Sequence, residues 1–286
     1  MRTPLSQRGL TLIELVVTLV ISTIVVSFVA MFISGPVQGF ADQSRRARLV
    51  DAADAAVKRI SRDIRRSLPN SVRITVAGGV TALEVLSTVD GARYRAQPPG
   101  TPDQILDLAA PDDSFNVLGS FTRLPKPVSL PNHHLAVYNV GVPGANAYEL
   151  ANVITPSGTI GIEADGGTGE DRVTLQQPFR FAHASPAQRV FLVDGPVSYL
   201  CDTVMGTLLR YDGYAITANQ AAVDSHGELL AAGATASLMA NQVTGCSFDY
   251  TPGTAERAGL VSLQIVVSAQ GETVSLLSQV HVDNGP

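Results

Sequence analysis

The strongest constraint on this chain is an uncharged segment near its N-terminus. No charged residue occurs between Glu14 and Asp42. A helix over residues 15–41 would be about 40 Å long at ~1.5 Å per residue, longer than the ~30 Å hydrocarbon core of a bilayer. Within it, small hydroxyls can bond to the helix's own carbonyl groups; they belong to Thr18, Ser22, Thr23 and Ser27. The sequence therefore predicts a membrane-spanning helix.

Glu14 places an acid at the start of this apolar segment. A charged side chain in a spanning helix costs roughly 2.5–3.5 kcal/mol at the helix centre and less near an end. We therefore expect the carboxylate to have a partner; the alternative is that it lies in the wet interface. A secretory signal peptide is a further alternative, but its apolar core of about 7–15 residues ends at a small-x-small site. This segment is longer and has no Ala-x-Ala at its end.

The residues around Glu14 read Arg8-Gly9-Leu10-Thr11-Leu12-Ile13-Glu14-Leu15. They resemble the class III signal of type IV prepilins and type II secretion pseudopilins. The resemblance implies that prepilin peptidase cleaves between Gly9 and Leu10 and methylates the new amino terminus at Leu10. Glu14 would then be the fifth residue of the mature chain. The family usually begins the mature chain with Phe, so Leu10 favours a minor member over a major pilin.

The spacing of Leu10 and Glu14 suits this processing. One helical turn separates them, so an amine created at Leu10 would lie near the same helix face as the carboxylate. In a stack of helices, Glu14 of one subunit can pair with the terminal amine of its neighbour. That pairing would remove the cost of a buried, unpaired acid and would fix the axial register between subunits. We therefore expect Glu14 to direct assembly.

Charge is unevenly distributed along the 286 residues. Residues 41–68 carry eight basic and four acidic side chains, whereas the residues from 69 onward carry ten basic and twenty acidic ones. The acidic part gives no reason to expect nucleic acid as a partner. Arg2 and Arg8 favour a cytoplasmic N-terminus, whereas the arginines at 45, 46 and 48 oppose it. Because long domains translocate largely regardless of charge, the motif leads us to expect a periplasmic C-terminal part.

The chain has two cysteines, Cys201 and Cys246. An oxidising periplasm favours a disulfide between them. Closing that loop would stabilise the fold by about 4 kcal/mol in the chain-entropy description. Two free buried thiols are the alternative. Redox catalysis is not expected, because there is no Cys-x-x-Cys spacing.

After the apolar segment, Gly35-Pro36 predicts a kink or short break. An amphipathic helix is expected over residues 42–68, ended by Pro69-Asn70. Its apolar positions recur three and four apart, at Val50, Ala53, Val57, Ile60, Ile64 and Leu68. Arginines occupy the opposite face. This pattern predicts a helix half buried against a globular head.

Beyond Pro69 the periodicity changes from 3.6 to 2, which indicates strands. Short β-type runs cover residues 71–77, 82–86, 134–140, 172–175, 189–193 and 197–201. The clearest pattern is at the C-terminus, where alternation over 261–267 and 274–282 predicts a hairpin with a turn at 269–271. Gly-rich residues 141–146 and 165–171 are expected to form surface loops.

Four further segments resemble minor pilins. The run 246–250, the run 257–261 and the strand 272–282 are similar to minor-pilin C-termini, and residues 191–201 are similar to minor prepilins of mannose-sensitive haemagglutinin (MSHA) pili. Cys201 and Cys246 fall in these segments.

The sequence contains no recognisable catalytic motif. The five histidines lack the i, i+4 spacing of a helical zinc site, and His281 is expected to face away from the core. The sequence has no Gly-x-Ser-x-Gly, Walker or dinucleotide motif. The acidic loop 163–171 is the candidate for calcium, but its spacing differs from an EF-hand and a solvated turn is the alternative. We expect no metal, no cofactor and no enzymatic activity.

The expected fold is α+β and type IV pilin-like: a long N-terminal transmembrane helix continues into an amphipathic helix packed on an antiparallel β-rich head. The expected parts are a cytoplasmic leader (1–9), a transmembrane helix (10–34), a periplasmic amphipathic helix (35–68) and a periplasmic head (69–286).

The resemblance implies a minor type IV pilin of the inner membrane. Its partners would be prepilin peptidase, other minor and major pilins, the inner-membrane assembly platform and membrane lipid, but not nucleic acid. One alternative is the large minor pseudopilin (J-type) of a type II secretion system. Another is a membrane-anchored periplasmic enzyme or binding protein, which would need a convergent polar pocket.

Overall fold

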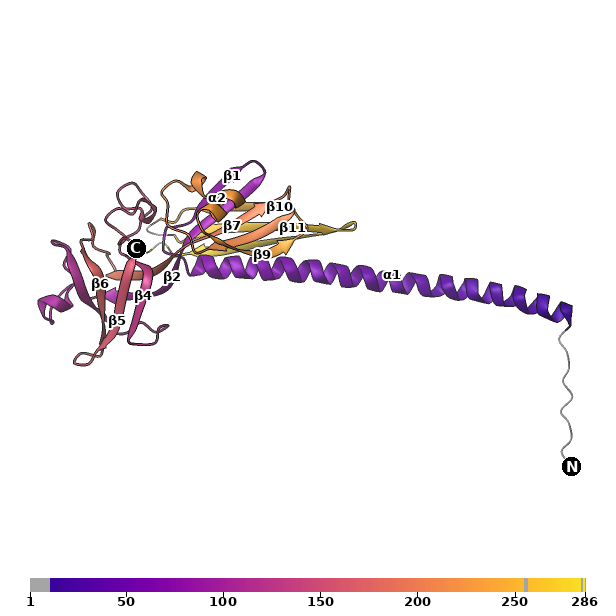
Figure 1. Cartoon of the computed structure of the whole chain (residues 1–286), viewed down its shortest axis with the longest axis horizontal. Coiled ribbons are helices and arrows are strands. Elements are labelled where there is room, and N and C mark those ends of the chain that lie inside the picture. The colour runs from indigo at the N-terminus through magenta and orange to yellow at the C-terminus, as the bar shows by residue number, and fades with distance from the viewer. Residues whose placement is uncertain (1–10, 255–256, 284, 286) are drawn as a thin grey trace, which may run out of the picture. The chain divides into compact units, whose positions relative to one another are not determined.

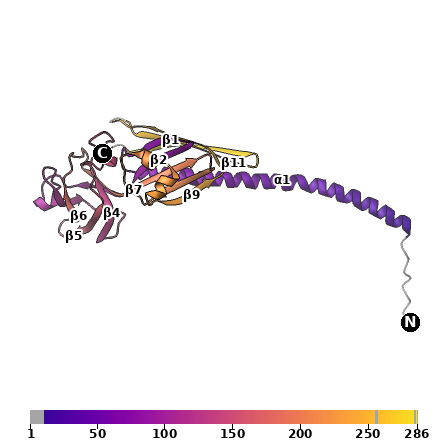
Figure 2. The ribbon, with the colours of Figure 1, turned by 45° about the horizontal axis from the view of Figure 1, so that its top comes forward.

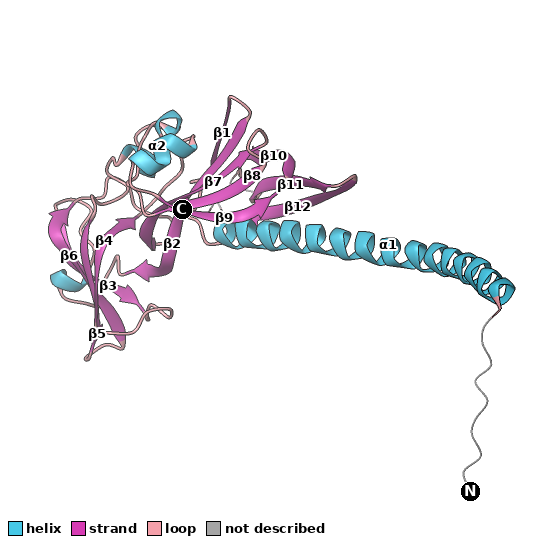
Figure 3. Cartoon of the chain, turned by 45° about the vertical axis from the view of Figure 1, so that its right-hand side comes forward, coloured by secondary structure: helices cyan, strands magenta, loops and turns pink. Residues whose placement is uncertain are grey.

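The computed structural model describes residues 11–254, 257–283 and 285. Within them, a long helix α1 (Leu12–Arg65) precedes a β-rich region that also contains the short helix α2 (His226–Ala231) (Figures 1 and 3). The strands are β1 (Arg73–Ala77), β2 (Val80–Tyr94), β3 (Asp112–Leu118), β4 (Val128–Ala136), β5 (Gly158–Asp165), β6 (Glu170–Phe179), β7 (Arg189–Asp202), β8 (Thr207–Asp212), β9 (Thr235–Asn241), β10 (Val243–Thr251), β11 (Gly259–Ala269) and β12 (Glu272–Val282). Three 3-10 helices cover Pro102–Gln104, Ala147–Glu149 and Gln220–Ala222.

The chain divides into two compact units after Arg48. In the first unit the described part is helical from Leu12 onward, and α1 continues without interruption through Pro36. A short break at Gly35-Pro36 is therefore wrong, whereas a kink there stays a prediction. A proline removes one backbone donor, and the helix retains its hydrogen bonds on either side of that position. α1 is long and apolar enough to cross a membrane, judged by length and composition.

In the second unit, residues 49–65 of α1 lie against the sheets. Their buried side chains recur three and four residues apart; they are Leu49, Ala53, Ala56, Val57, Ile60, Ser61 and Ile64. All of them except Ser61 belong to one apolar cluster with Leu83 of β2, Tyr199 of β7 and Val261 of β11. Burial at roughly 25 cal/mol per Å² of apolar surface stabilises the helix on the sheets. α1 ends at Arg65, where Ser67 N–H bonds to the Ile64 carbonyl in a tighter turn.

Six of the strands close into a barrel. The large sheet has the order β1-β2-β3-β6-β5-β4-β7-β8-β9, and β2 also pairs with β7. The ring β2-β3-β6-β5-β4-β7 is thereby complete, and all of its pairs are antiparallel. Its interior is a separate apolar cluster built around Phe115, Leu135, Ile162, Phe181 and Leu192. Closure removes the exposed strand edges that an open sheet of this size would leave.

The strands β2 and β7 belong to both the barrel and the helix-bearing lobe. Residues 80–87 of β2 pair with residues 195–202 of β7 beside α1, and the same strands continue to Arg93↔Arg189 in the barrel. Figure 2 shows β4, β5 and β6 grouped apart from β1, β9 and β11, with β2 and β7 between them. The barrel is therefore built on one end of this strand pair, and its other four strands come from the chain between β2 and β7.

β7 is one strand where the sequence predicted two, at 189–193 and 197–201. Asp194-Gly195-Pro196 has the composition of a turn, but the structure accommodates it inside the strand. Gly195 has a φ of 132°, and the register with β2 shifts opposite Thr88. β4 pairs with β7 only up to Val193 and β8 only from Ser198, so Pro196 needs no second partner strand.

The C-terminal hairpin is confirmed. β11 and β12 pair over their full lengths, from Gly259↔Val282 to Ala269↔Glu272. Gln270 and Gly271 both have positive φ, as a tight hairpin turn requires. β10 completes a three-stranded sheet on the other side of β11. His281 is exposed, as expected, while Val280 and Val282 on either side are buried.

Candidate functional site

The N-terminal site begins where α1 begins. Gly9 and Leu10, the predicted cleavage and methylation positions, lie outside the described residues. Thr11 precedes the first helical residue, and its hydroxyl accepts a hydrogen bond from the Glu14 N–H at 3.3 Å. This is the bond that an N-cap residue makes to the first turn. Thr11-x-x-Glu14 also has the spacing of a capping box. This role of the two residues was not predicted from the sequence.

Glu14 lies in the first turn of α1 and is exposed. The amino end of a helix carries partial positive charge, which favours a carboxylate there. Large apolar side chains on both sides are exposed as well, including Leu12 at 84%, Ile13 at 73% and Leu15 at 51%. An acid surrounded by apolar surface is thus presented on the outside of this unit.

Four hydroxyls of the apolar segment donate hydrogen bonds to carbonyl groups of the helix itself. Thr18, Thr23 and Ser27 each donate to a carbonyl three or four residues earlier, at 3.0, 2.8 and 2.8 Å. Ser34 does the same to Met31 at 3.0 Å. These bonds match the expectation from the sequence for three of the four hydroxyls it named. They leave a surface that a lipid environment or other apolar helices can cover at low cost.

A disulfide joins Cys201 of β7 to Cys246 of β10, with an S–S distance of 1.99 Å. It connects the large sheet to the three-stranded sheet. Cys201 is fully buried in the apolar cluster that holds α1, and the partly buried Cys246 packs against that cluster. Neither sulfur is available as a thiol, and the bond acts as a covalent tie between the two sheets.

The acidic loop 163–171 has most of its carboxylates engaged by protein donors. Asp165 accepts hydrogen bonds from Asn116 at 2.8 Å and Gln104 at 2.9 Å. Glu170 forms an ion pair with Arg95. Hydrogen bonds from Asn116 to Asp165 and from Arg95 to Glu170 are the largest influences that lower the pKa values of these two carboxyls.

Asp171 of the same loop also forms an ion pair, because Lys126 Nζ lies 2.7 Å from Asp171 Oδ2. In the described ranges, His, Cys, Asp and Glu form no group of three or more arranged to hold a metal ion. Residues 165–170 make the turn between β5 and β6, which places the Gly-rich segment in a hairpin.

A buried polar cluster lies where β1 and β2 meet the loop after β8. Arg73 Nη2 is 2.8 Å from the fully buried Glu84 Oε2. The Arg73 guanidinium stacks 3.6 Å from the centre of the Tyr148 ring and donates to the carbonyls of Thr217 and Ala218. Burial raises the pKa of Glu84 to about 7, although Arg73 opposes the shift. This cluster joins four chain segments: β1, β2, the 3-10 helix Ala147–Glu149 and the loop after β8.

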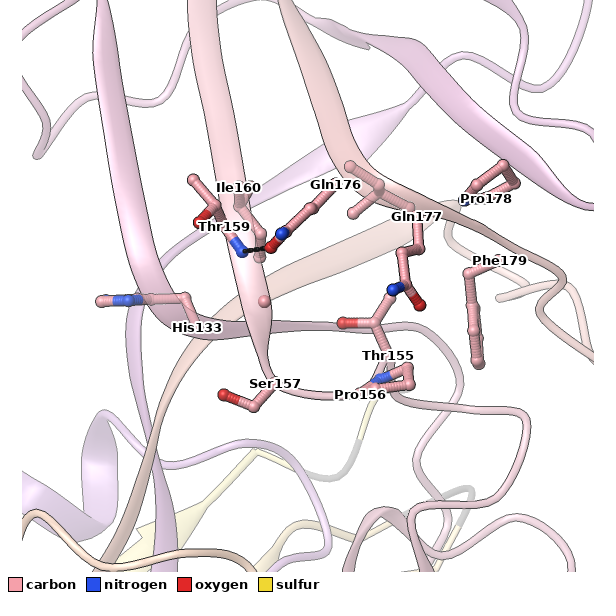
Figure 4. Close-up of a pocket in the computed structure, with 12 residues that line it drawn as sticks. His133, Thr155, Pro156, Ser157, Thr159, Ile160, Gln176, Gln177, Pro178 and Phe179 are labelled. Carbon is pink, nitrogen blue, oxygen red and sulfur yellow. Dashed lines mark hydrogen bonds between the residues drawn. The ribbon is translucent and has the colours of Figure 1, made fainter.

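A shallow pocket of about 230 Å³ lies in the barrel wall (Figure 4). It is formed by residues 155–157, the start of β5, the end of β6 and His133 of β4. The Gln176 carboxamide points to Thr159 and accepts its N–H at 3.1 Å. The carboxamide of Gln177 points toward Thr155 instead. No motif in the sequence indicated this pocket, because its members come from three separate strands and from the loop before β5.

Comparison with known proteins bears on the N-terminal site. Residues 5–33 match the family described as the prokaryotic N-terminal methylation motif. No curated protein and no solved structure is significantly similar to the chain. The matched segment includes Gly9, Leu10 and Glu14 and runs into the exposed apolar part of α1. This match suggests that the chain is anchored in a membrane by a single helix and that it is a structural pilin and not an enzyme.

The N-terminal match, the long apolar helix and the antiparallel β-rich region after it together support a type IV prepilin-like protein, a pilin or pseudopilin substrate of prepilin peptidase.

Proposed function

We propose that this chain is a minor type IV pilin, cleaved after Gly9 and N-methylated at Leu10 by prepilin peptidase. The single observation that carries the proposal is the methylation motif over residues 5–33, which continues into an exposed apolar helix with one acid in its first turn. The mature protein primes a pilus or is incorporated into it.

Glu14 supplies the assembly contact in this proposal. Its carboxylate pairs with the methylated amine of a neighbouring subunit once the helices pack together. Because water is excluded from such a bundle, the pair would be much stronger than it is at an exposed surface. The exposure of Glu14 and of the apolar side chains around it supports this role.

The more specific role is that of an MshO-like minor prepilin of MSHA pilus biogenesis. The resemblance of residues 191–201 and of the C-terminal segments to minor pilins supports it. The disulfide ties these two resembling regions together, at Cys201 and Cys246. Other minor pilins, the major pilin and the inner-membrane assembly platform are the proposed partners, in addition to the peptidase.

The proposed topology follows from the same features. The leader and its arginines stay in the cytoplasm, α1 crosses the inner membrane, and the β-rich head lies in the periplasm. A disulfide in the head suits that oxidising compartment. The membrane lipid would cover the apolar side chains of α1 until the subunit enters a filament.

Processing tests the proposal directly. The full chain is co-expressed with prepilin peptidase, and the membrane fraction is examined by mass spectrometry. Wild-type protein should begin at N-methylated Leu10. Gly9→Val should retain its leader, because a Cβ beside the scissile bond obstructs the peptidase. Gly35→Val is the matched control, since a Cβ added at Gly35 meets no atom within 4 Å. Normal leader removal in Gly9→Val would refute the proposal.

A deletion strain then separates a pilus from a secretion system. Restoration of surface pili by the wild-type gene supports the minor-pilin role. Restoration of type II protein secretion, with no effect on piliation, would instead identify a large J-type pseudopilin. Genes for MSHA components beside this gene would also support the minor-pilin role.

A further inference from the structure

The pocket in the barrel wall lies where β6 stops pairing with its two neighbouring strands. β5 and β6 pair from Asp165↔Glu170 to Ile160↔Leu175 and no further. On its other side, β6 pairs with β3 at Ser114↔Thr174 and next at Asp112↔Phe179. The segment 176–178 therefore leaves both neighbouring strands before β6 rejoins the sheet. This excursion opens the pocket of about 230 Å³.

The pocket is polar, and His133 is its only titratable side chain. Its lining contains no Asp, Glu, Lys or Arg; it consists of His133, Thr155, Pro156, Ser157, Gly158, Thr159, Ile160, Leu175, Gln176, Gln177, Pro178 and Phe179. Carboxamides and hydroxyls supply both donors and acceptors of hydrogen bonds. Two prolines and the Phe179 ring supply apolar faces beside them. Ser157, Gln176 and Gln177 are exposed, so a ligand can reach these groups from solvent.

Two of the lining residues, Gln176 and Thr155, are fixed by hydrogen bonds before any ligand arrives. The Gln176 oxygen accepts the Thr159 N–H, which leaves its NH₂ group directed away from that bond as a donor. Thr155 is buried, and its hydroxyl accepts the Leu135 N–H at 2.9 Å. The Thr155 carbonyl is also bonded, to His134 Nδ1 at 2.7 Å. Groups held in this way lose little freedom when a ligand binds.

We propose that this pocket binds one ring of a neutral carbohydrate. A sugar ring carries hydroxyls around its edge and C–H groups on its faces. The carboxamides of Gln176 and Gln177 and the Ser157 hydroxyl bond the edge, and Phe179 with the prolines covers a face. A pocket of this size is smaller than the roughly 300–1,000 Å³ typical of drug-sized ligands, which suits one ring.

Other ligand classes fit the lining less well. A phosphate, nucleotide or sugar acid would bring negative charge to a pocket with no lysine or arginine. A wholly apolar ligand would bury the two carboxamides without hydrogen bonds. An extended peptide could pair with the strand edge left by residues 176–178. Because the Thr159 N–H on the opposing strand is already occupied by Gln176, the peptide is the less favoured ligand.

The test uses the full-length chain in phospholipid nanodiscs, because glycoside detergents would compete for the pocket. The probes are methyl glucoside, methyl galactoside, methyl mannoside and methyl N-acetylglucosaminide, titrated by saturation-transfer NMR. At least one of them should bind saturably with a Kd of about 1 mM. Methyl glucuronide, which differs from methyl glucoside by its carboxylate, should bind more weakly than methyl glucoside.

Variants locate the binding. Gln177→Ala should weaken it by about fivefold, the loss expected for one hydrogen bond. Gln176→Ala should weaken it by at least as much, since it also releases Thr159. Gln264→Ala is the matched control, because Gln264 is an exposed glutamine of β11 that does not line the pocket. An unchanged thermal melting temperature in the variants shows that their barrel is intact.

Three results would overturn the proposal. They are the absence of saturable binding by all four neutral glycosides, equal weakening by Gln264→Ala and Gln177→Ala, and binding of a neutral extended peptide in place of every glycoside. The proposal does not depend on leader cleavage or on Glu14. If no sugar binds, the proposed pilin function is unaffected. If the pilin function is refuted, the proposed sugar site is unaffected.

Discussion

Arg210 of β8 and Asp63 of α1 form a partly buried ion pair, with Arg210 Nε 2.9 Å from Asp63 Oδ2. The Tyr199 hydroxyl of β7 donates to the same oxygen at 2.8 Å. Both charged side chains are only about a tenth exposed, at 13% and 11%. One carboxylate thus connects the last turn of the helix to two adjacent strands of the large sheet.

Asp63→Asn should therefore weaken the attachment of α1. The substitution keeps the size of the side chain but leaves the Arg210 guanidinium without its buried counter-charge. We expect the free energy of unfolding to fall by about 1–3 kcal/mol. Thermal unfolding of the nanodisc-embedded protein, followed by near-UV circular dichroism, measures the change. Asp54→Asn is the control, because its Lys58 partner is 70% exposed and exposed pairs contribute only ~0–1 kcal/mol. Equal effects of the two variants would contradict the assigned role of Asp63.

Cys201→Ser should destabilise the head without affecting processing. Loss of the disulfide frees the three-stranded sheet from β7, and removal of such a bond typically costs about 2–5 kcal/mol. Unfolding in urea should occur at lower concentration in the variant and in reduced wild-type protein alike. Leader cleavage after Gly9 should proceed normally, because the head and the leader lie on opposite sides of the membrane in the proposed topology. Two freely alkylated thiols in native exported protein would contradict the pairing.

Glu84 should make stability depend on pH. Burial raises its pKa from 4.5 to about 7 in the folded protein, so the folded state holds this proton more tightly than the unfolded state. Between those two values the folded state binds more protons, and stability must fall as the pH rises through this window. Above pH 7 the loss from this group is complete.

The melting temperature should accordingly decline between pH 5 and pH 7 in wild-type protein. Glu84→Gln cannot ionise, so its profile should be flatter over that range. Glu163→Gln, at an exposed position of β5, should retain the wild-type profile. A decline that persists unchanged in Glu84→Gln would assign the pH dependence to another group.

Glu14→Ala should separate membrane insertion from assembly. Loss of the charge makes insertion no less favourable. Cleavage after Gly9 should largely persist, so the variant should accumulate in the inner membrane at its mature size. Surface pili should decline or disappear, because the partner for a neighbouring amine is gone. Glu14→Asp should be partly defective, since its carboxylate is shorter by one methylene. Fractionation and pilus counts give the result, and normal piliation with Glu14→Ala as the sole copy would contradict the role.

The sequence predicted the elements whose periodicity is long or regular. The apolar segment before Asp42 and the three- and four-residue spacing up to Ile64 both lie in α1. The alternation around Leu263 is realised in β11 and β12. Such patterns persist because one face of each element meets a single apolar layer.

Other elements could not be read in this way. The proline at position 36 predicted a break, yet α1 continues through it. Tyr138 was expected within a strand, but it has a φ of 60° and lies beyond β4, which ends at Ala136. The barrel was not predicted, because closure depends on pairing β2 with β7 across about a hundred residues of chain. Local patterns carry no information about such a long-range register.

The two candidate sites differ in the same respect: one is formed by neighbouring residues in the sequence, and the other is formed by residues far apart in it. The N-terminal site could be recognised because Gly9, Leu10 and Glu14 are close in sequence and form one motif. The pocket could not, because Gln177 and Thr155 come together only through the irregular end of β6. Its glutamines look like ordinary exposed residues until the strands are in place.

The continuity of β2 and β7 has a mechanical consequence. A pull applied to the barrel passes to the helix-bearing lobe through two unbroken strands and the ladder between them, which runs from Val80↔Asp202 to Arg93↔Arg189. There is no flexible tether to extend first. In a fibre under tension, the barrel would transmit force directly to the strands beside α1, and these strands would unfold only when many backbone hydrogen bonds failed together.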